Sequence, residues 1–466
     1  MSIPRGLEAD NSSGPIFSAA LAVSGSFTRP AAKSVSVIAP QSPRPSLILQ
    51  ALEKRRDEKI RRKKNLFRRI FLAAAAAFVL PALVFAQEIP FLNTRINGYV
   101  KSLNFFTHTT GFAPEAADSP LGLAEKKESV FSTMERFRAK IRSSFNLAEG
   151  HKIKLKIDYD HQAFFGSFVG TGDFRLAKHQ QEERQFLDLS QTLVEDDGVF
   201  YEHRLYRASV EYENDYFSVE IGRQQIPWGV GHFFTPTDLF NPFNPTQIEL
   251  EERDGVDAVN IMTKKYDGYA LQMVYTPRGK DLHPYRYLAR LSKDIENYEV
   301  GLIGGRVLRD HVAGFDLQGN IKNSAVRGEF LYREADEEKD FISFTVNADY
   351  NFPKNIYGLL EYHFNGRGRR DPRSYQVDKL LRGDIQQLAK NYVAALLGYN
   401  ITPLLRFENH AIFNADDQSV FLRPELRYEA QANLLFTLAG QFYLGGPTEE
   451  FGMPENLYIG ELNYSF

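Results

Sequence analysis

The chain has 466 residues, of which 43% are hydrophobic and 25% charged, and its formal net charge is −3. This length allows two or three soluble domains. A protein with several membrane-spanning helices is excluded, because each helix needs about 20 apolar residues and only residues 70–86 form a continuous apolar run. With no cysteine in the sequence, disulfides, thiolate zinc sites and a cysteine nucleophile are excluded as well.

The first 86 residues have the composition of targeting sequence. Residues 1–52 are rich in Ser, Pro and Ala without any period, and we expect a disordered leader or sequence upstream of a misassigned start codon. Residues 53–86 combine a dense basic block, a short apolar core and a small-residue site, which predicts a secretory signal peptide cleaved after Ala86. The alternative is an N-terminal anchor helix, although Pro81 interrupts the apolar core.

Cleavage there changes the charge balance. Residues 1–86 hold 14 basic and 5 acidic residues, so the mature chain keeps 42 basic and 54 acidic ones, a net charge of −12. An acidic exported protein is a poor match for nucleic acid. We therefore expect no nucleic-acid partner.

From residue 95 onward the sequence alternates with a period of two. In residues 341–352 (FISFTVNADYNF), apolar side chains alternate with polar ones along the whole stretch. Successive side chains of a strand point to opposite faces, so this pattern predicts a strand with one apolar and one polar face. The same alternation recurs in residues 151–160, 420–429 and 456–466.

The alternating segments favour a membrane barrel over a soluble sandwich. They run to about ten to fourteen residues, whereas soluble strands average about 5–6 and strands that cross a bilayer need about 9–11. Tyr and Phe lie near the segment ends, as an interfacial aromatic girdle requires. We place roughly 18 strands (16–18) in residues 87–466 and predict an all-β, transmembrane, antiparallel up-and-down barrel.

The lengths of the connections support this prediction. Every second connection is a turn of a few residues, whereas most of the others are long, such as 110–130, 166–199, 226–255 and 367–390. Short periplasmic turns and long extracellular loops are typical of outer-membrane barrels. An even number of strands also places both ends of the barrel on the short-turn side.

Two rows of basic residues are predicted on the inner face of the first strands. They comprise Arg136, Arg138, Lys140 and Arg142 on one strand and Lys152, Lys154 and Lys156 on the next. We expect the rows to lie side by side. One interpretation is a balanced wall in which nearby carboxylates neutralise them, and the other is an electropositive pore wall that guides anionic solutes.

Residues 226–255 form the most unusual connection. They contain the only tryptophan, several X-Pro bonds and an acidic end. The prolines reduce the entropy lost when the segment becomes ordered, and the aromatic rings gain by packing against a wall. We predict a constriction loop folded into the pore, with the alternative of an ordered external cap. The residues expected at the constriction are Trp228, Phe233, Phe234, Asp238, Phe240, Glu249, Glu251 and Glu252.

This region also carries a resemblance. GRQQIPWG (222–229), TPTDLFNPFNP (235–245) and EERDGVDAV (251–259) resemble a porin-like family of Gram-negative outer-membrane barrels of poorly characterised function, and more distantly the alginate-export type of barrel. The resemblance implies a barrel and solute passage without fixing a substrate. The last strand, ending in Tyr464, Ser465 and Phe466, resembles the C-terminal signature that the barrel-assembly machinery reads.

These features together predict a porin-like channel in the outer membrane. The expected partners are outer-membrane lipid, the barrel-assembly machinery and small hydrophilic solutes, with trimerisation left open and no cofactor or metal. Enzyme activity is not expected, because the ten histidines are scattered and neither G-x-S-x-G nor H-E-x-x-H occurs. The alternative is a structural or adhesive barrel, or an outer-membrane enzyme, with a closed lumen.

Overall fold

The computed structural model describes most of the chain from Asn93 onward. The described residues are 93–110, 127–172, 174, 175, 177, 178, 185–196, 198–242, 244–249, 253–277, 285–336, 338–382 and 385–466. The predicted leader, signal peptide and cleavage site lie outside them, as do Phe243, Glu251 and Glu252.

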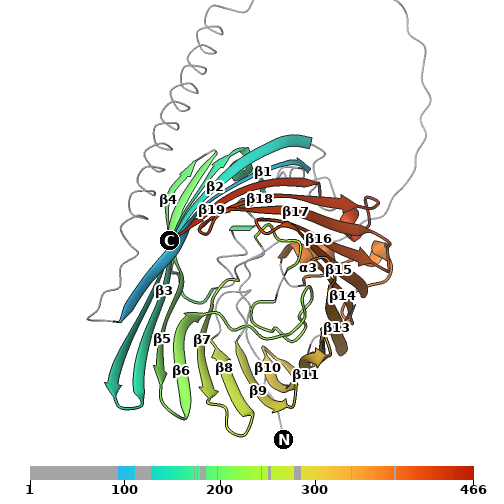
Figure 1. Cartoon of the computed structure of the whole chain (residues 1–466). Helices are drawn as coiled ribbons and strands as arrows, with labels where there is room; N and C mark the ends of the chain where they lie inside the picture. The colour runs from blue at the N-terminus through green and yellow to red at the C-terminus, as the bar shows by residue number, and fades with distance from the viewer. Residues whose placement is uncertain are drawn as a thin grey trace, which may run out of the picture. The chain divides into compact units, whose positions relative to one another are not determined.

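Nineteen strands are present in the described part (Figure 1). Their bounds are β1 Thr94–Thr110, β2 Lys127–Ala148, β3 His151–Gly166, β4 Ser190–Asp196, β5 Val199–Glu213, β6 Phe217–Gln224, β7 Val256–Thr263, β8 Tyr269–Thr276, β9 Arg286–Ile295, β10 Tyr298–Val307, β11 Asp310–Ile321, β12 Ser324–Glu334, β13 Phe341–Phe352, β14 Ile356–Asn365, β15 Asn391–Thr402, β16 Leu405–Asn414, β17 Val420–Gln431, β18 Leu434–Leu444 and β19 Leu457–Ser465.

Short helical connections include η1 Ser167–Gly170, η2 Pro372–Ser374, α3 Val377–Arg382 and η3 Glu450–Gly452. None of these described helices has the length and apolar character needed to cross a bilayer.

Eighteen of the strands close into one antiparallel ring. Sequential strands pair with each other, β3 pairs with β5, and β19 returns to pair with β1. Closure gives the first and last strands a partner on both sides, so neither leaves an open sheet edge. The predicted all-β antiparallel barrel of about 18 strands is confirmed. The extra strand is β4, which the sequence analysis missed; it pairs with the outer end of β5 inside the second long connection.

The connections follow the predicted alternation. The β2–β3 connection is Glu149-Gly150, the β11–β12 connection is Lys322-Asn323, and the segment between β6 and β7 spans 225–255. Long connections gather at one end of the barrel and short turns at the other, because every strand is antiparallel to its neighbours.

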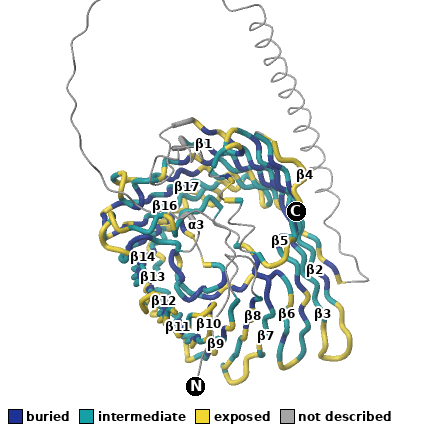
Figure 2. The backbone as a smooth tube through the Cα atoms, turned by 180° about the vertical axis from the view of Figure 1, so that it is seen from behind, coloured by how far each residue is buried: buried dark blue, intermediate teal, exposed yellow. Residues whose placement is uncertain are grey.

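Burial across the wall is the reverse of that in a soluble sheet. On β13 the polar Ser343, Thr345 and Asn347 are buried, whereas Ile342 and Val346 face outward with 39% and 50% of their surface exposed. The outer face carries many further exposed apolar side chains, among them Leu302, Phe315, Leu360, Leu397 and Leu438. Figure 2 shows buried and exposed residues alternating along the strands.

The apolar clusters lie inside the ring rather than between stacked sheets. One joins Ile226, Trp228 and Phe240 to side chains of β7 to β12. A second joins Phe233 and Phe234 to side chains of β14 to β17 and the connections beside them. The segment between β6 and β7 therefore supplies one side of these two clusters and the wall supplies the other.

Candidate functional site

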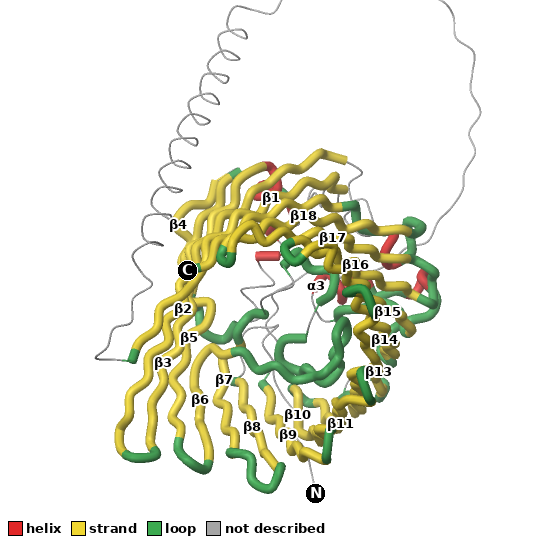
Figure 3. Tube along the Cα trace, viewed as in Figure 1, coloured by secondary structure: helices red, strands yellow, loops and turns green. Residues whose placement is uncertain are grey.

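The segment between β6 and β7 runs inside the barrel. Figure 3 shows it as a green trace within the ring of yellow strands. It contacts β12, β14, β17 and β18, whose residues are about 90 to 195 positions away in sequence. We refer to residues 226–255 as the inner loop.

Two buried carboxylates of the wall hold the first half of the inner loop by its backbone. Glu361 on β14 is 0% exposed, and Glu329 on β12 is 2% exposed. Glu361 accepts hydrogen bonds at 2.7–3.0 Å from the backbone N–H groups of His232, Phe233 and Phe234. Glu329 accepts them at 2.5–3.0 Å from those of Val230, Gly231 and Thr237, and at 2.6 Å from the Thr237 hydroxyl. We call these bonds the amide attachment.

The wall carboxylates and the loop N–H groups of the amide attachment complement each other as acceptors and donors. An ionised carboxylate only accepts hydrogen bonds, and a tight loop presents backbone donors without partners. Glu361 lies opposite Asn347 and Ala394 on the neighbouring strands, so no cation faces it across the sheet. The loop amides therefore satisfy buried carboxyl oxygens that have no cation opposite them in the sheet.

Glycine makes the required backbone path possible. Gly229 has a φ of +91°, a region that side chains disfavour. A Cβ atom on Gly231 would lie 2.0 Å from the backbone oxygen of Phe234. The loop can curl around the two carboxylates only because these positions carry no side chain.

Aromatic rings fill the space between the first half of the loop and the wall. Trp228 packs edge-on against Phe240 with ring centroids 5.0 Å apart, and its indole N–H donates to Gln272 at 2.9 Å. Phe234 stacks on His363 of β14 at 4.6 Å. Trp228, Phe234 and Phe240 are almost fully buried, so this half of the loop is a packed structure.

The second half of the inner loop is held by donors and cations of the wall. Arg423 on β17 donates to the carbonyl oxygens of Gln247 and Ile248 at 2.9 and 3.0 Å. Gln441 on β18 donates to the carbonyl oxygens of Thr246 and Gln247. Glu249 forms ion pairs with Arg136 at 2.7 Å and Lys101 at 3.3 Å. We call these bonds the carbonyl attachment.

Two acidic residues of the loop, Asp238 and Glu249, differ in their environment. Burial raises the pKa of Asp238 to about 7, and its ion pair with Arg253 at 2.8 Å opposes this only in part. Burial also disfavours the charge of Glu249, but the facing Arg136 and Lys101 outweigh it and hold the pKa of Glu249 at about 2. Charge on the loop is thus retained where the wall supplies cations.

Six of the eight residues expected at the constriction are described, and all six lie on the inner loop. Trp228, Phe233, Phe234, Asp238 and Phe240 are buried against the wall. Glu249 is the predicted acidic residue that meets the predicted basic row.

The expectation that the two basic rows lie side by side is wrong. The pairing of β2 with β3 sets Arg138 opposite Asp160, and the rows meet only where Arg142 faces Lys156. In a hairpin, residues equally far from the turn face each other, and the arginine row lies farther from the turn than the lysine row.

The basic residues face acids instead. The recorded ion pairs join Arg136 to Glu249, Arg138 to Asp160, Arg142 to Asp158, Lys154 to Glu211 and Glu213, and Lys156 to Glu211 and Glu220. Lys152 lies opposite Glu213, and the Lys140 ammonium lies 5.5 Å from the ring centre of Tyr99. This geometry matches the balanced-wall interpretation.

Two cavities border the inner loop. One, of about 990 Å³, lies between the first half of the loop and the long-connection ends of β9 to β14. The other, of about 400 Å³, lies between the second half and β1 to β5 and is lined by Phe105, Phe164, Phe168, Phe174 and Phe200 together with charged residues. No cluster of His, Asp and Glu suited to a metal ion occurs among the described residues.

Sequence reasoning did not find Glu329 and Glu361. The residues opposite Glu329 are Asp316 and Thr345, so no cation faces it across the sheet. An inward carboxylate that has no cation across the sheet must find another partner, here the backbone of the inner loop. This can be recognised only once the register of the strands is known.

The C-terminal residues close the ring. Phe466 exchanges backbone hydrogen bonds with Gly98 of β1 at 2.9 and 3.0 Å, and its ring stacks on Phe137 of β2 at 6.0 Å. Tyr464 lies opposite Val100 in the pairing of β19 with β1. Both residues of the predicted assembly signal thus belong to the seam between the first and last strands.

No family model matches the chain, and no curated protein matches it. Solved structures with a similar fold include a triple mutant of the Rhodopseudomonas blastica porin, with a TM-score of 0.41 and 11% identity, covering 80% of this chain and 100% of that one. Another is Pseudomonas aeruginosa OccK8 (OprE), with a TM-score of 0.46 and 9% identity, covering 80% of this chain and 97% of that one. At these scores the likeness carries no argument about function, and the barrel rests on the strand pairing within this chain.

Proposed function

We propose that this protein is a porin-like channel of the outer membrane that passes small hydrophilic solutes, with the inner loop as its constriction. The observation that carries the proposal is the reversed burial of a closed wall: apolar side chains face outward and polar ones face the lumen. Only a closed barrel satisfies all backbone groups of a sheet in lipid, and a polar interior suits water and solutes. The resemblance of residues 222–259 to porin-like barrels supports the same function.

Export and assembly belong to the same proposal. The basic and apolar segment 53–86 would direct export, with cleavage after Ala86. The aromatic end of β19 would be read by the barrel-assembly machinery.

The inner loop would act as the constriction by occupying part of the lumen. It is attached to β12 and β14 at one point and to β17, β18 and β2 at another. A segment held at these points inside the ring occupies part of the lumen. Solutes would therefore pass beside the loop, through the spaces that it leaves next to the wall.

The test is single-channel current in a planar lipid bilayer. We expect stepwise conductance for the intact protein and a conductance several times larger after deletion of residues 233–244. Absence of steps from correctly folded protein would favour a structural, adhesive or enzymatic barrel with a closed lumen. Steps that the deletion leaves unchanged would contradict the role of the inner loop as constriction.

A further inference from the structure

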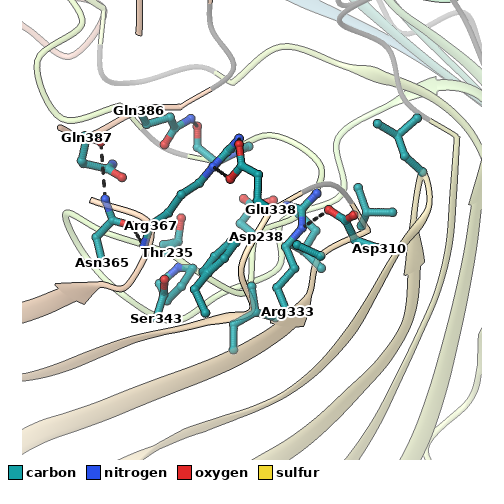
Figure 4. Close-up of a pocket in the computed structure, with 18 of the residues that line it drawn as sticks. Thr235, Asp238, Asp310, Arg333, Glu338, Ser343, Asn365, Arg367, Gln386 and Gln387 are labelled. Carbon is teal, nitrogen blue, oxygen red and sulfur yellow. Dashed lines mark hydrogen bonds and ion pairs between the residues drawn. The ribbon is translucent and has the colours of Figure 1, made fainter. Parts of the chain in front are cut away.

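The larger of the two cavities beside the inner loop has the features of a ligand site. Its wall is built from β9 to β14 and their long connections, and its floor from residues 234–242 of the loop. Figure 4 shows that Arg333 pairs with Asp310 and Arg367 with Glu338 at its edge. Most of the charge around the cavity is therefore already matched within the protein.

Arg286, the first residue of β9, is the exception. Its Nε is buried and makes no hydrogen bond, and no ion pair is formed by its guanidinium within the described part of the chain. The guanidinium carbon lies 5.8 Å from the ring centre of Phe240 on the inner loop. Guanidinium groups recognise planar oxyanions through pairs of parallel N–H donors. A buried donor without a partner is costly, so this one favours a ligand that accepts from it.

A second unsatisfied group lines the same cavity. Thr235 is 6% exposed, and its hydroxyl oxygen has no partner among the described residues. It belongs to the inner loop, whereas Arg286 belongs to the wall. Two polar groups without partners therefore lie on different elements around one cavity.

The charge of Asp238 acts on Arg286, but the two side chains form no ion pair. The Asp238 side chain is fully buried, and its carboxylate is used by Arg253 at 2.8 Å and by the backbone N–H groups of Phe240 and Asn241. Burial also raises the pKa of Asp238 to about 7, so near neutral pH part of the population is uncharged. Among the described residues, Arg286 therefore has no ion-pair partner at this cavity.

We propose that this cavity binds a small solute through a single oxyanion group, a carboxylate or a phosphate, which Arg286 holds and the Thr235 hydroxyl assists. The proposal deepens the channel function by naming the class of solute that enters from the long-connection end. A neutral solute of the same size lacks the group that satisfies Arg286 and binds weakly.

The only tryptophan supplies a direct readout that does not depend on conduction. Trp228 packs on Phe240, and Arg286 lies over the same phenylalanine ring. Gluconate, inorganic phosphate and glucose are titrated separately into the detergent-solubilised full-length protein at constant ionic strength, and Trp228 fluorescence is followed. We expect a saturable change with gluconate, phosphate or both, which also identifies the oxyanion, and no saturable change with glucose.

Variants locate the binding. Arg286→Gln should weaken oxyanion binding by at least about tenfold, as expected when a charge-assisted hydrogen-bonded pair is lost. Thr235→Val should weaken it by a few-fold, and Arg286→Lys should recover part of the loss. Arg306→Gln removes the same charge from an exposed position on β10 and should leave binding unchanged.

Each result decides the proposal. No saturable response to either oxyanion, an equal response to glucose, or oxyanion binding that survives Arg286→Gln would overturn it. The emission maximum of each variant without solute shows whether the inner loop is still packed, and Thr235→Val serves if Arg286→Gln fails to fold. If the protein binds the oxyanion but does not conduct, the channel proposal is wrong and the oxyanion site is still supported.

Discussion

The two attachments of the inner loop use hydrogen bonds of opposite direction. At the amide attachment, wall carboxylates on β12 and β14 accept hydrogen bonds from loop N–H groups. At the carbonyl attachment, the wall supplies donors on β17 and β18 for loop carbonyl groups, and cations on β1 and β2 for Glu249. The inner wall of this barrel is therefore matched to the backbone polarity of its own loop.

The attachments differ in how they depend on side chains of the loop. The amide attachment uses backbone donors, the hydroxyl of Thr237 and the missing side chain of Gly231. The carbonyl attachment uses backbone acceptors and one charged side chain, Glu249. Mutations in the wall should therefore affect both attachments. On the loop side, a change in pH should affect only the carbonyl attachment, through Glu249.

The largest effect is expected from Glu329→Gln combined with Glu361→Gln. Each change replaces one acceptor oxygen by an N–H₂ group that faces loop donors, and charged hydrogen bonds contribute about 1.5–3 kcal/mol each. We expect the first half of the loop to detach and the single-channel conductance to rise toward that of the loop deletion. Glu334→Gln, at an exposed position on β12, is the control; conductance of the double variant equal to that of the control would refute the amide attachment.

Gly231→Ala should have the next largest effect. The added methyl group meets the backbone oxygen of Phe234, and such overpacking costs about 1–3 kcal/mol. We expect larger fluctuations of the open-channel current and a partial rise in conductance. Gln247→Ala keeps the carbonyl oxygen used at the other attachment and should behave as wild type. If the current of Gly231→Ala fluctuates no more than that of wild type, the curled backbone path is not required.

Arg423→Gln should loosen the carbonyl attachment by a smaller amount. Gln441 still holds two loop carbonyl groups, and Glu249 still pairs with Arg136. We expect increased current fluctuations with little change in mean conductance. Arg406→Gln on β16, which removes a guanidinium paired with Glu408, provides the matched control. A conductance increase as large as that of the double glutamine variant would reverse the predicted ranking of the attachments.

The smallest effect is the pH dependence of Glu249. Its pKa in the folded protein, about 2, lies below the ordinary value of 4.5. The stabilisation from its ion pairs is therefore complete above about pH 4.5 and is lost as the pH falls through about 2. The melting temperature of wild type should exceed that of Glu249→Gln by a constant amount above pH 5, and the difference should vanish near pH 2. A difference that disappears already at pH 4.5 would mean that the Arg136 and Lys101 pairs are weak.

The strand faces could be predicted because they depend on local alternation alone. In residues 341–352 every polar position expected to face inward from 343 to 347 is buried, and Ile342 and Val346 face outward. The short turns followed from the same periodicity. Strand β4 was missed because seven mostly exposed residues inside a long connection show no buried face.

The candidate site was only partly predictable. The aromatic residues and prolines of the inner loop indicated a segment that packs, and its acidic end supplied three of the residues expected at the constriction. Its partners could not be identified, because Phe233 and Glu361 are 128 positions apart and only the register of the closed ring brings them together. The basic rows show the same limit: residue type predicted their inward orientation, whereas register decided that acids, and not the other row, face them.

The central claim is that the inner loop crosses the lumen and touches the far wall. His232 on the loop and His410 on β16 have ring centres 6.4 Å apart, and the chain has no cysteine of its own. A His232→Cys/His410→Cys protein, treated in native membranes with a short bifunctional maleimide, should form an internal crosslink that changes the mobility of the unfolded chain in electrophoresis. A His232→Cys/Leu360→Cys pair, with its second cysteine on the outer face, should not. If both cysteines of the first pair react singly and no crosslink forms, the loop does not lie inside the barrel.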